Sequence, residues 1–261
     1  PAAFCAFFSL YALYVLSRGP DARWHTYATA GFFAGMAAAF ETPATAMLGL
    51  GAAYVAYVAY RRGGIGALAF VPAAILPVIA FFVSNYVCTG RWIPFQWTFP
   101  QHYDPYWFHP TGMDALAEPK HRYLFHLTLG HHGFFSLTPV LLFGLIGIVR
   151  HLLDRRSPLR AMAGIVGLSS AAVFSFNTMM TNNYGGTCQG ARWLFWLVPL
   201  WLVMVPAGVE PVARSRLGRS VALLLLAVSA FSAAYAVHMP WSQSWLHSLI
   251  PETAATVVSS S

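Results

Sequence analysis

Residues 24–62 read WHTYATAGFFAGMAAAFETPATAMLGLGAAYVAYVAYRR, and Glu41 is the only charged side chain before the final pair of arginines. A single helix over this run would be about 55 Å long, well beyond the roughly 30 Å of a bilayer core. A hairpin at Glu41-Thr42-Pro43 gives two spans instead, because Pro43 lacks the N–H that a continuing helix needs. The stretch therefore predicts two paired membrane helices joined by a tight turn.

The first arm of this hairpin carries Gly31-x-x-x-Gly35, a spacing that lets two helices approach closely. We expect this face to pack against another helix of the same chain, with a dimer contact as the alternative. The arms are short, so Glu41 is expected just below the outer headgroups, where an ionisable group usually faces a cavity.

Similar apolar runs recur along the chain, which is 57% hydrophobic and 9% charged. A soluble domain of this length would need a more polar surface. We therefore predict an all-α, polytopic integral membrane protein with about eight transmembrane helices, one long extracytoplasmic loop and a single transmembrane domain over 1–261. The expected spans lie near 2–16, 24–40, 44–60, 67–86, 138–153, 160–178, 191–209 and 220–238.

The basic residues indicate the orientation of these spans. Eleven of the fifteen Lys and Arg residues fall on one set of alternate connections: Arg18, Arg23, Arg61, Arg62, Arg150, Arg155, Arg156, Arg160, Arg214, Arg216 and Arg219. Positive charge collects on the cytoplasmic side, so the opposite connections are expected to be extracytoplasmic. We expect a multi-pass protein of the bacterial inner (plasma) membrane, with the lipid bilayer as its partner. The formal net charge is +7, but the basic residues lie in short clusters beside apolar runs. No nucleic-acid partner is therefore predicted.

The one long connection, 87–137, is expected on the outer side and is rich in histidine and aromatic residues. It contains His102, Asp104, His131 and His132 together with several Trp and Tyr residues. Aromatic faces with acids and imidazoles suit sugars or polar headgroups, but an aromatic belt at the membrane interface is an equal alternative. No Cys-x-x-Cys or His-Glu-x-x-His motif occurs, so no cofactor is predicted and a divalent metal is unsupported.

A second outer connection has the sharpest local pattern. It reads Tyr184-Gly185-Gly186-Thr187-Cys188-Gln189-Gly190-Ala191-Arg192. Glycines leave backbone N–H groups exposed, and an Arg beside them can bind a phosphate. From the spacing alone, an Arg that snorkels to the interface is an equal interpretation. Cys88 and Cys188 both fall on outer connections, where an oxidising compartment would permit a disulfide between them.

Three stretches together resemble the GT-C superfamily of polytopic glycosyltransferases that use polyprenyl-phosphate sugars. Ser84-Asn85-Tyr86-Val87-Cys88-Thr89-Gly90-Arg91-Trp92-Ile93-Pro94 is similar to the segment that opens the family's large outer loop. Gly133-Phe134-Phe135-Ser136-Leu137-Thr138-Pro139 is similar to that loop's return into the membrane. The third stretch, Tyr184 to Arg192 with Pro199, is similar to the family's late Gly-Gly…Gly-x-Arg…Pro segment.

This resemblance implies transfer of a sugar from a polyprenyl-phosphate donor to an acceptor at the extracytoplasmic face. It favours Arg192 as the phosphate ligand and implies substrate-binding roles for Glu41, His102, Asp104, His131, His132, Tyr184, Gly185 and Gly186. The family's essential Asp lies in an early outer loop that this sequence does not contain before Glu41, and its catalytic residue is therefore unknown.

The start at Pro1, inside an apolar run, is typical of a fragment or of a processed chain. Residues 2–16 lack the basic leader of a secretory signal, so we expect a C-terminal fragment of a longer enzyme. A transporter or flippase, and a non-catalytic membrane scaffold, are the alternative functions. Transport would need ionisable groups near the bilayer midplane, and the expected spans contain few.

Overall fold

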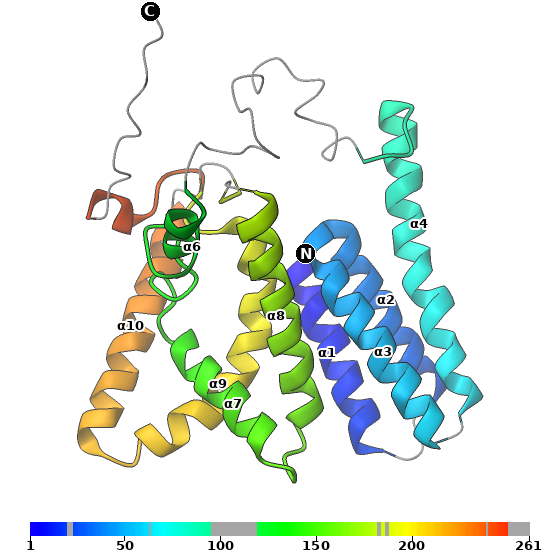
Figure 1. Cartoon of the computed structure of the whole chain (residues 1–261), viewed down its shortest axis with the longest axis horizontal. Helices are drawn as coiled ribbons and strands as arrows, with labels where there is room; N and C mark the ends of the chain where they lie inside the picture. Colours follow the sequence, from blue (N-terminus) through cyan, green and yellow to red (C-terminus); the bar gives the residue numbers. More distant parts are fainter. Residues whose placement is uncertain are drawn as a thin grey trace, which may run out of the picture. The chain divides into compact units, whose positions relative to one another are not determined.

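The structure is a computed structural model that describes residues 1–19, 23–62, 64–94, 119–181, 184–185, 188–238 and 240–249. Within these ranges the chain is all-helical and contains no β-strand (Figure 1). The predicted all-α class is thus confirmed. The helices are α1 (Ala2–Arg18), α2 (Trp24–Phe40), η1 (Thr42–Ala44), α3 (Thr45–Arg62), η2 (Ile65–Ala69), α4 (Phe70–Thr89), α6 (Lys120–Thr128), α7 (Leu141–Leu153), α8 (Arg160–Met180), η4 (Arg192–Leu197), α9 (Val198–Val212), α10 (Arg216–His238) and η5 (Trp245–Ser248).

The chain divides into two compact units. Unit 1 comprises Pro1–Gln96, Phe143–Phe174 and Phe195–Pro211, and unit 2 comprises Trp97–Leu142, Ser175–Leu194 and Val212–Ser261. This division does not test the predicted single transmembrane domain over 1–261, which stays a prediction.

Within the described part of the chain, five helical segments are long and apolar enough to cross a membrane, which indicates a membrane protein. They are Thr42–Arg62, Ile65–Thr89, Arg160–Met180, Arg192–Val212 and Arg216–His238. Each of the eight expected spans coincides with a helix, but the count of eight is not confirmed, because three of these helices are shorter than the five segments above. Helices α1 and α2 have 17 residues each, and α7 has 13 residues. A helix of the latter length reaches only about 20 Å.

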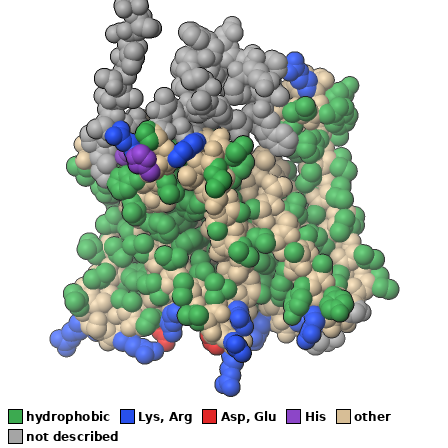
Figure 2. Space-filling view, in the orientation of Figure 1, with side chains coloured by type: hydrophobic (Ala, Val, Ile, Leu, Met, Phe, Trp, Pro, Cys, Tyr) green, Lys and Arg blue, Asp and Glu red, His purple; other side chains and the backbone are tan. Residues whose placement is uncertain are grey.

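The long apolar helices leave most of their side chains uncovered. Only 22% of the most apolar window of Ile65–Thr89 and 11% of that in Arg216–His238 are buried. In water such surfaces would be an aggregation liability, whereas lipid tails solvate them. Figure 2 shows hydrophobic side chains over the helix faces, with Lys and Arg side chains gathered near helix ends.

In unit 1, the hairpin predicted at Glu41-Thr42-Pro43 is confirmed. Helix α2 ends at Phe40, η1 forms the turn, and α3 begins at Thr45. The Gly31 and Gly35 face of α2 packs against α4 within the same chain. A Cβ at either glycine would lie 2.2 Å from a backbone oxygen of α4, that of Phe70 or Ala74. Close backbone approach therefore fixes this helix pair.

The ends of α1 and α3 are tied together by Arg62. Its guanidinium donates hydrogen bonds to the backbone oxygens of Leu16 at 2.7 Å, Ser17 at 3.2 Å and Gly19 at 2.6 Å. These are carbonyls that the last turn of α1 leaves without intrahelical partners. Arg18 and Arg62 therefore lie at the same end of unit 1, as the alternating charge pattern predicted.

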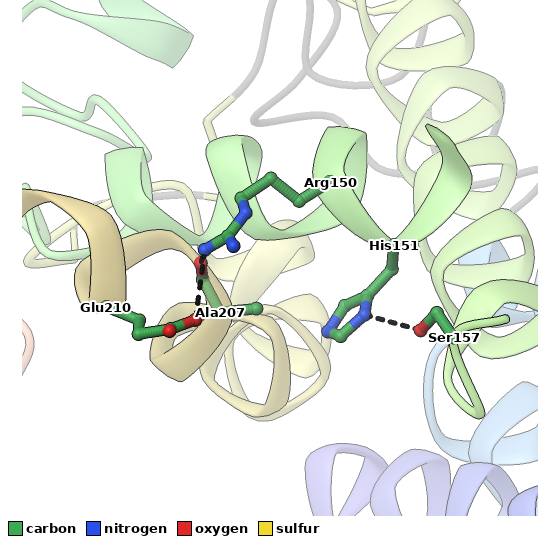
Figure 3. A network of polar contacts seen from close by, with 5 residues as sticks. All are labelled: Arg150, His151, Ser157, Ala207 and Glu210. Carbon is green, nitrogen blue, oxygen red and sulfur yellow. Dashed lines mark hydrogen bonds and ion pairs between the residues drawn. The ribbon is translucent and has the colours of Figure 1, made fainter. Parts of the chain in front are cut away.

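Glycines also allow α7 and α9 to pack closely in unit 1. A Cβ at Gly147 would meet the backbone oxygen of Met204, and one at Gly208 would meet that of Phe143. At the end of this contact, Arg150 donates to the carbonyl of Ala207 and pairs with Glu210 at 3.3 Å (Figure 3). Both charged side chains are largely exposed, so the ion pair itself adds little stability.

The expected long outer loop, 87–137, is not confirmed as a continuous loop. Helix α4 extends to Thr89, and α6 occupies Lys120–Thr128. Residues 95–118 lie outside the described part of the chain.

Candidate functional site

The candidate site lies entirely in unit 2 and begins with the turn that follows α6. The N–H groups of Phe134 and Phe135 donate to the carbonyls of Leu127 at 2.9 Å and Thr128 at 2.9 Å. The chain therefore folds back on the last turn of α6. This fold-back brings His131 and His132 against His126 of the helix.

Four imidazoles gather at this point. The ring of His131 lies 4.1 Å from that of His126, 4.6 Å from that of His132 and 5.2 Å from that of His247, measured between ring centroids. His131 and His132 are almost fully buried, at 0% and 4% exposed. We call His126, His131, His132 and His247 the histidine cluster.

Burial sets the charge of His131 and His132. Together with the neighbouring imidazoles, it lowers the pKa of His131 from 6.5 to about 3 and that of His132 to about 4. Both side chains are therefore neutral at pH 7. Neutral imidazoles can donate and accept hydrogen bonds, but they supply no positive charge to a ligand.

The histidine cluster is not arranged as a metal centre. Among the described residues, no group of three or more His, Cys, Asp or Glu side chains could hold a metal ion. The imidazoles instead pack ring against ring, with the Nδ1 atoms of His131 and His132 only 2.5 Å apart.

The Gly-rich connection packs directly on the histidine cluster through Tyr184. The Tyr184 ring stacks on His132 at 4.5 Å with an interplanar angle of 5° and on Tyr123 of α6 at 4.8 Å. The N–H of Ala191 donates to the carbonyl of His132 at 3.2 Å, so the two outer connections are joined by a backbone hydrogen bond as well.

Gly185 brings this connection against Arg192. The φ of Gly185 is +102°, and a Cβ there would lie 2.7 Å from the Cβ of Arg192. The N–H of Arg192 donates to the carbonyl of Tyr184 at 3.0 Å. Only glycine fits this combination of backbone conformation and close contact.

The C-terminal segment 240–249 covers the same connection. The Gln189 amide donates to the Ser242 hydroxyl at 2.5 Å and to the Gln243 carbonyl at 2.9 Å. Ser244 donates to the backbone oxygen of His131. The indole N–H of Trp245 donates to Ser232 of α10 at 2.9 Å, which anchors the segment on that helix.

Arg192 brings a guanidinium to the Gly185 turn. Its guanidinium carbon lies 6.0 Å from the centre of the Trp241 ring, within reach of a cation–π contact. The side chain is exposed, and its guanidinium makes no hydrogen bond or ion pair with any described residue. Its five N–H donors therefore have no partner among the described residues, and their charge and geometry suit an anionic ligand.

The structure brings together five of the predicted site residues: His131, His132, Tyr184, Gly185 and Arg192. Glu41 belongs to unit 1, at the end of α2. His102, Asp104 and Gly186 lie outside the described residues. The substrate-binding roles assigned to all of these residues stay predictions.

The predicted pairing of Cys88 with Cys188 is not formed in the structure, where both side chains are free thiols. Cys88 is exposed in unit 1, and Cys188 is buried in unit 2, where its sulfur lies 2.7 Å from the carbonyl oxygen of Gly190.

Sequence reasoning missed the contributions of the C-terminal segment. Trp241 lies under Arg192, and Trp245 is held by α10. His247 joins the histidine cluster from 115 residues beyond His132 in sequence numbering. The local signal for this segment is its group of Trp and His residues, Trp241, Trp245 and His247.

The chain matches no protein-family model, no curated protein and no solved structure.

Proposed function

We propose that this protein is part of a membrane glycosyltransferase that moves a sugar from a polyprenyl-phosphate donor to an acceptor at the extracytoplasmic face of a bacterial plasma membrane. The observation that carries the proposal is Arg192, an exposed guanidinium with no partner among the described residues, held beside a glycine turn and an aromatic ring. The resemblance of three sequence stretches to GT-C enzymes supports the same assignment.

The proposed reaction is a displacement at the anomeric carbon. The acceptor hydroxyl loses its proton to a base, its oxygen bonds to the anomeric carbon, and the bond from that carbon to the phosphate oxygen breaks. Negative charge then grows on the departing polyprenyl phosphate. A guanidinium within hydrogen-bonding reach stabilises that charge in the transition state more than in the ground state. This is the role that we assign to Arg192; no residue of this sequence is assigned as the base.

The other site residues serve to hold Arg192 and to meet the sugar. Tyr184 accepts the N–H of Arg192 at its backbone oxygen and offers an aromatic ring backed by His132. Trp241 keeps the guanidinium over an apolar face, which lowers the number of water molecules to be displaced when phosphate binds. His131 and His132 are buried behind Tyr184, so in this proposal they position it.

The direct test is to bind a polyprenyl phosphate to the purified protein and to measure that binding through the fluorescence of the protein's Trp residues. We expect Arg192→Ala to weaken binding about tenfold or more, because a hydrogen-bonded charge contributes roughly 1.5–3 kcal/mol. Arg192→Lys should recover part of the loss, since it keeps the charge without the planar fork. Arg216→Ala is the matched control. Arg216 lies in the same unit, at the first residue of α10 and away from the turn at Gly185.

An unchanged affinity in Arg192→Ala would remove the basis of the proposal. Substrate flux in proteoliposomes without release of polyprenyl phosphate would instead favour the transporter alternative.

A further inference from the structure

A pocket in unit 1 carries positive charge that nothing in the described chain neutralises. It has a volume of about 530 Å³ and lies where the end of α1 meets the connection between α7 and α8. Its lining residues include Ser17, Arg18, Leu152, Ser157, Pro158 and Arg160. This volume is within the range of small-molecule sites, about 300–1,000 Å³.

Arg18 and Arg160 bring two exposed guanidinium groups to this pocket. Neither group makes a hydrogen bond or ion pair with a described residue, and none of the lining residues is acidic. Two other arginines of unit 1 differ in this respect. Arg62 donates to backbone carbonyls at the end of α1. Arg150 donates to the Ala207 carbonyl and forms an ion pair with Glu210 (Figure 3).

The like charges of Arg18 and Arg160 repel each other because both side chains line one pocket. A bound anion would reduce that repulsion. The N-terminus of α8 adds to the same field. This helix has 21 residues and begins at Arg160, so the positive end of its dipole lies at the pocket.

The position of the pocket points to a lipid. Arg160 is the first residue of a segment long and apolar enough to cross a membrane, so the pocket lies at the end of a span, at the depth of the headgroups. This end carries Arg18, Arg62 and Arg160, as expected for the cytoplasmic side. Anionic phospholipids give that leaflet its negative surface potential, and basic pockets between helices bind their headgroups.

We propose that this pocket binds the phosphate group of an anionic phospholipid, with Arg18 and Arg160 as its two ligands. The wall formed by Leu152 lies beside the glycerol and the first acyl carbons. The proposal is independent of the sugar-transfer function and concerns another part of the chain.

The test is native mass spectrometry of the purified protein in detergent, titrated with dioleoyl phosphatidylglycerol. Phosphatidylcholine with the same acyl chains and inorganic phosphate are titrated in parallel. We expect preferential binding of phosphatidylglycerol, and a loss of about tenfold or more in that affinity for Arg18→Ala/Arg160→Ala. The matched control is Arg155→Ala/Arg156→Ala, which removes the same charge from the same connection but alters no lining residue. We expect less than a twofold change there.

A charge-neutral variant separates the pocket from general electrostatics and from misfolding. Ala161 also lines the pocket, and Ala161→Leu should narrow it and weaken phosphatidylglycerol binding while both arginines remain. Equal losses in the two double-arginine variants would overturn the proposal, as would unchanged binding in the pocket variants. Binding of inorganic phosphate as strong as that of phosphatidylglycerol would overturn the assignment to a lipid.

Discussion

Gly185 is constrained both by its backbone conformation and by its contact with Arg192. Its positive φ and its contact with Arg192 act together: the turn places the Tyr184 carbonyl where the N–H of Arg192 can reach it. A side chain at this position must therefore shift either the turn or the arginine. The position of Arg192 therefore depends on the absence of a side chain at Gly185.

We expect Gly185→Ala to lower the melting temperature by more than the backbone conformation alone requires. Gly90→Ala is the matched control, because Gly90 also has a positive φ, +68°, but a Cβ there meets nothing within 4 Å. The control should lose about 1–2 kcal/mol from left-handed backbone strain. Gly185→Ala should lose clearly more, because its φ of +102° lies farther from the left-handed region and because the new Cβ clashes with Arg192. Equal losses in detergent-solubilised protein would contradict the close contact.

The histidine cluster predicts a pH-dependent stability. The pKa values of His131 and His132 in the folded protein, about 3 and about 4, lie below the value of 6.5 expected when they are exposed. Between these values the unfolded chain binds more protons, so stability rises with pH. It is fully present above about pH 6.5 and is lost as the pH falls through the folded values of about 4 and about 3. We expect the melting temperature in detergent to drop between pH 7.5 and pH 5.

The variant that checks this cause is His131→Asn/His132→Asn. Its melting temperature should be lower at pH 7.5 but should change less between pH 7.5 and pH 5 than that of the unaltered protein. His25→Asn, at an exposed position of α2, should keep the full pH dependence. A double variant with an unchanged pH slope would show that other groups titrate.

Sequence reasoning found the residues of the site better than their roles. Tyr184, Gly185 and Arg192 were predicted together because their types and spacing are local. The burial of His131 and His132 could not be predicted, since it depends on Tyr184 and on the C-terminal segment returning to the same place. Long-range contacts of this kind leave no periodic signal in the chain.

Among the helices, the glycine face of α2 is a contact that leaves no room for a side chain. We expect Gly31→Ala/Gly35→Ala to destabilise the protein by about 1–3 kcal/mol or more, because each new methyl group would overlap a backbone oxygen of α4. Gly49→Ala in α3 is the control, since a Cβ there meets nothing within 4 Å. It should be neutral or slightly stabilising. Similar melting temperatures for the two variants would contradict the close packing of α2 on α4.

The hairpin and the helix positions followed from the sequence, but the lengths of the helices did not. Pro43 and the clustered arginines mark where a helix must end, so the turn after α2 was predicted correctly. Helix α7 was expected to begin at 138, yet it begins at Leu141 and has 13 residues. Apolar composition continues through the preceding turn, where Phe134 and Phe135 donate back to α6, so hydropathy alone could not separate turn from helix.

Across the full sequence, the alternating arginines predict one orientation in the membrane. In this predicted orientation the connection that carries Arg192 is expected on the outer side, and the connections that carry Arg18 and Arg160 are expected on the cytoplasmic side. Both proposed sites depend on this sidedness, because a polyprenyl-phosphate sugar used outside the cell and an anionic inner-leaflet lipid are available on opposite sides.

Labelling of single cysteines in intact cells with a membrane-impermeant maleimide tests this sidedness most directly. The background is Cys5→Ala/Cys88→Ala/Cys188→Ala, and the probes are Gln243→Cys, Arg61→Cys and Arg155→Cys, all at exposed positions. We predict that Gln243→Cys is labelled in intact cells, whereas Arg61→Cys and Arg155→Cys are labelled only after the membrane is permeabilised. Labelling of Arg61→Cys or Arg155→Cys in intact cells, with Gln243→Cys protected, would contradict the orientation and with it the proposed site of sugar transfer.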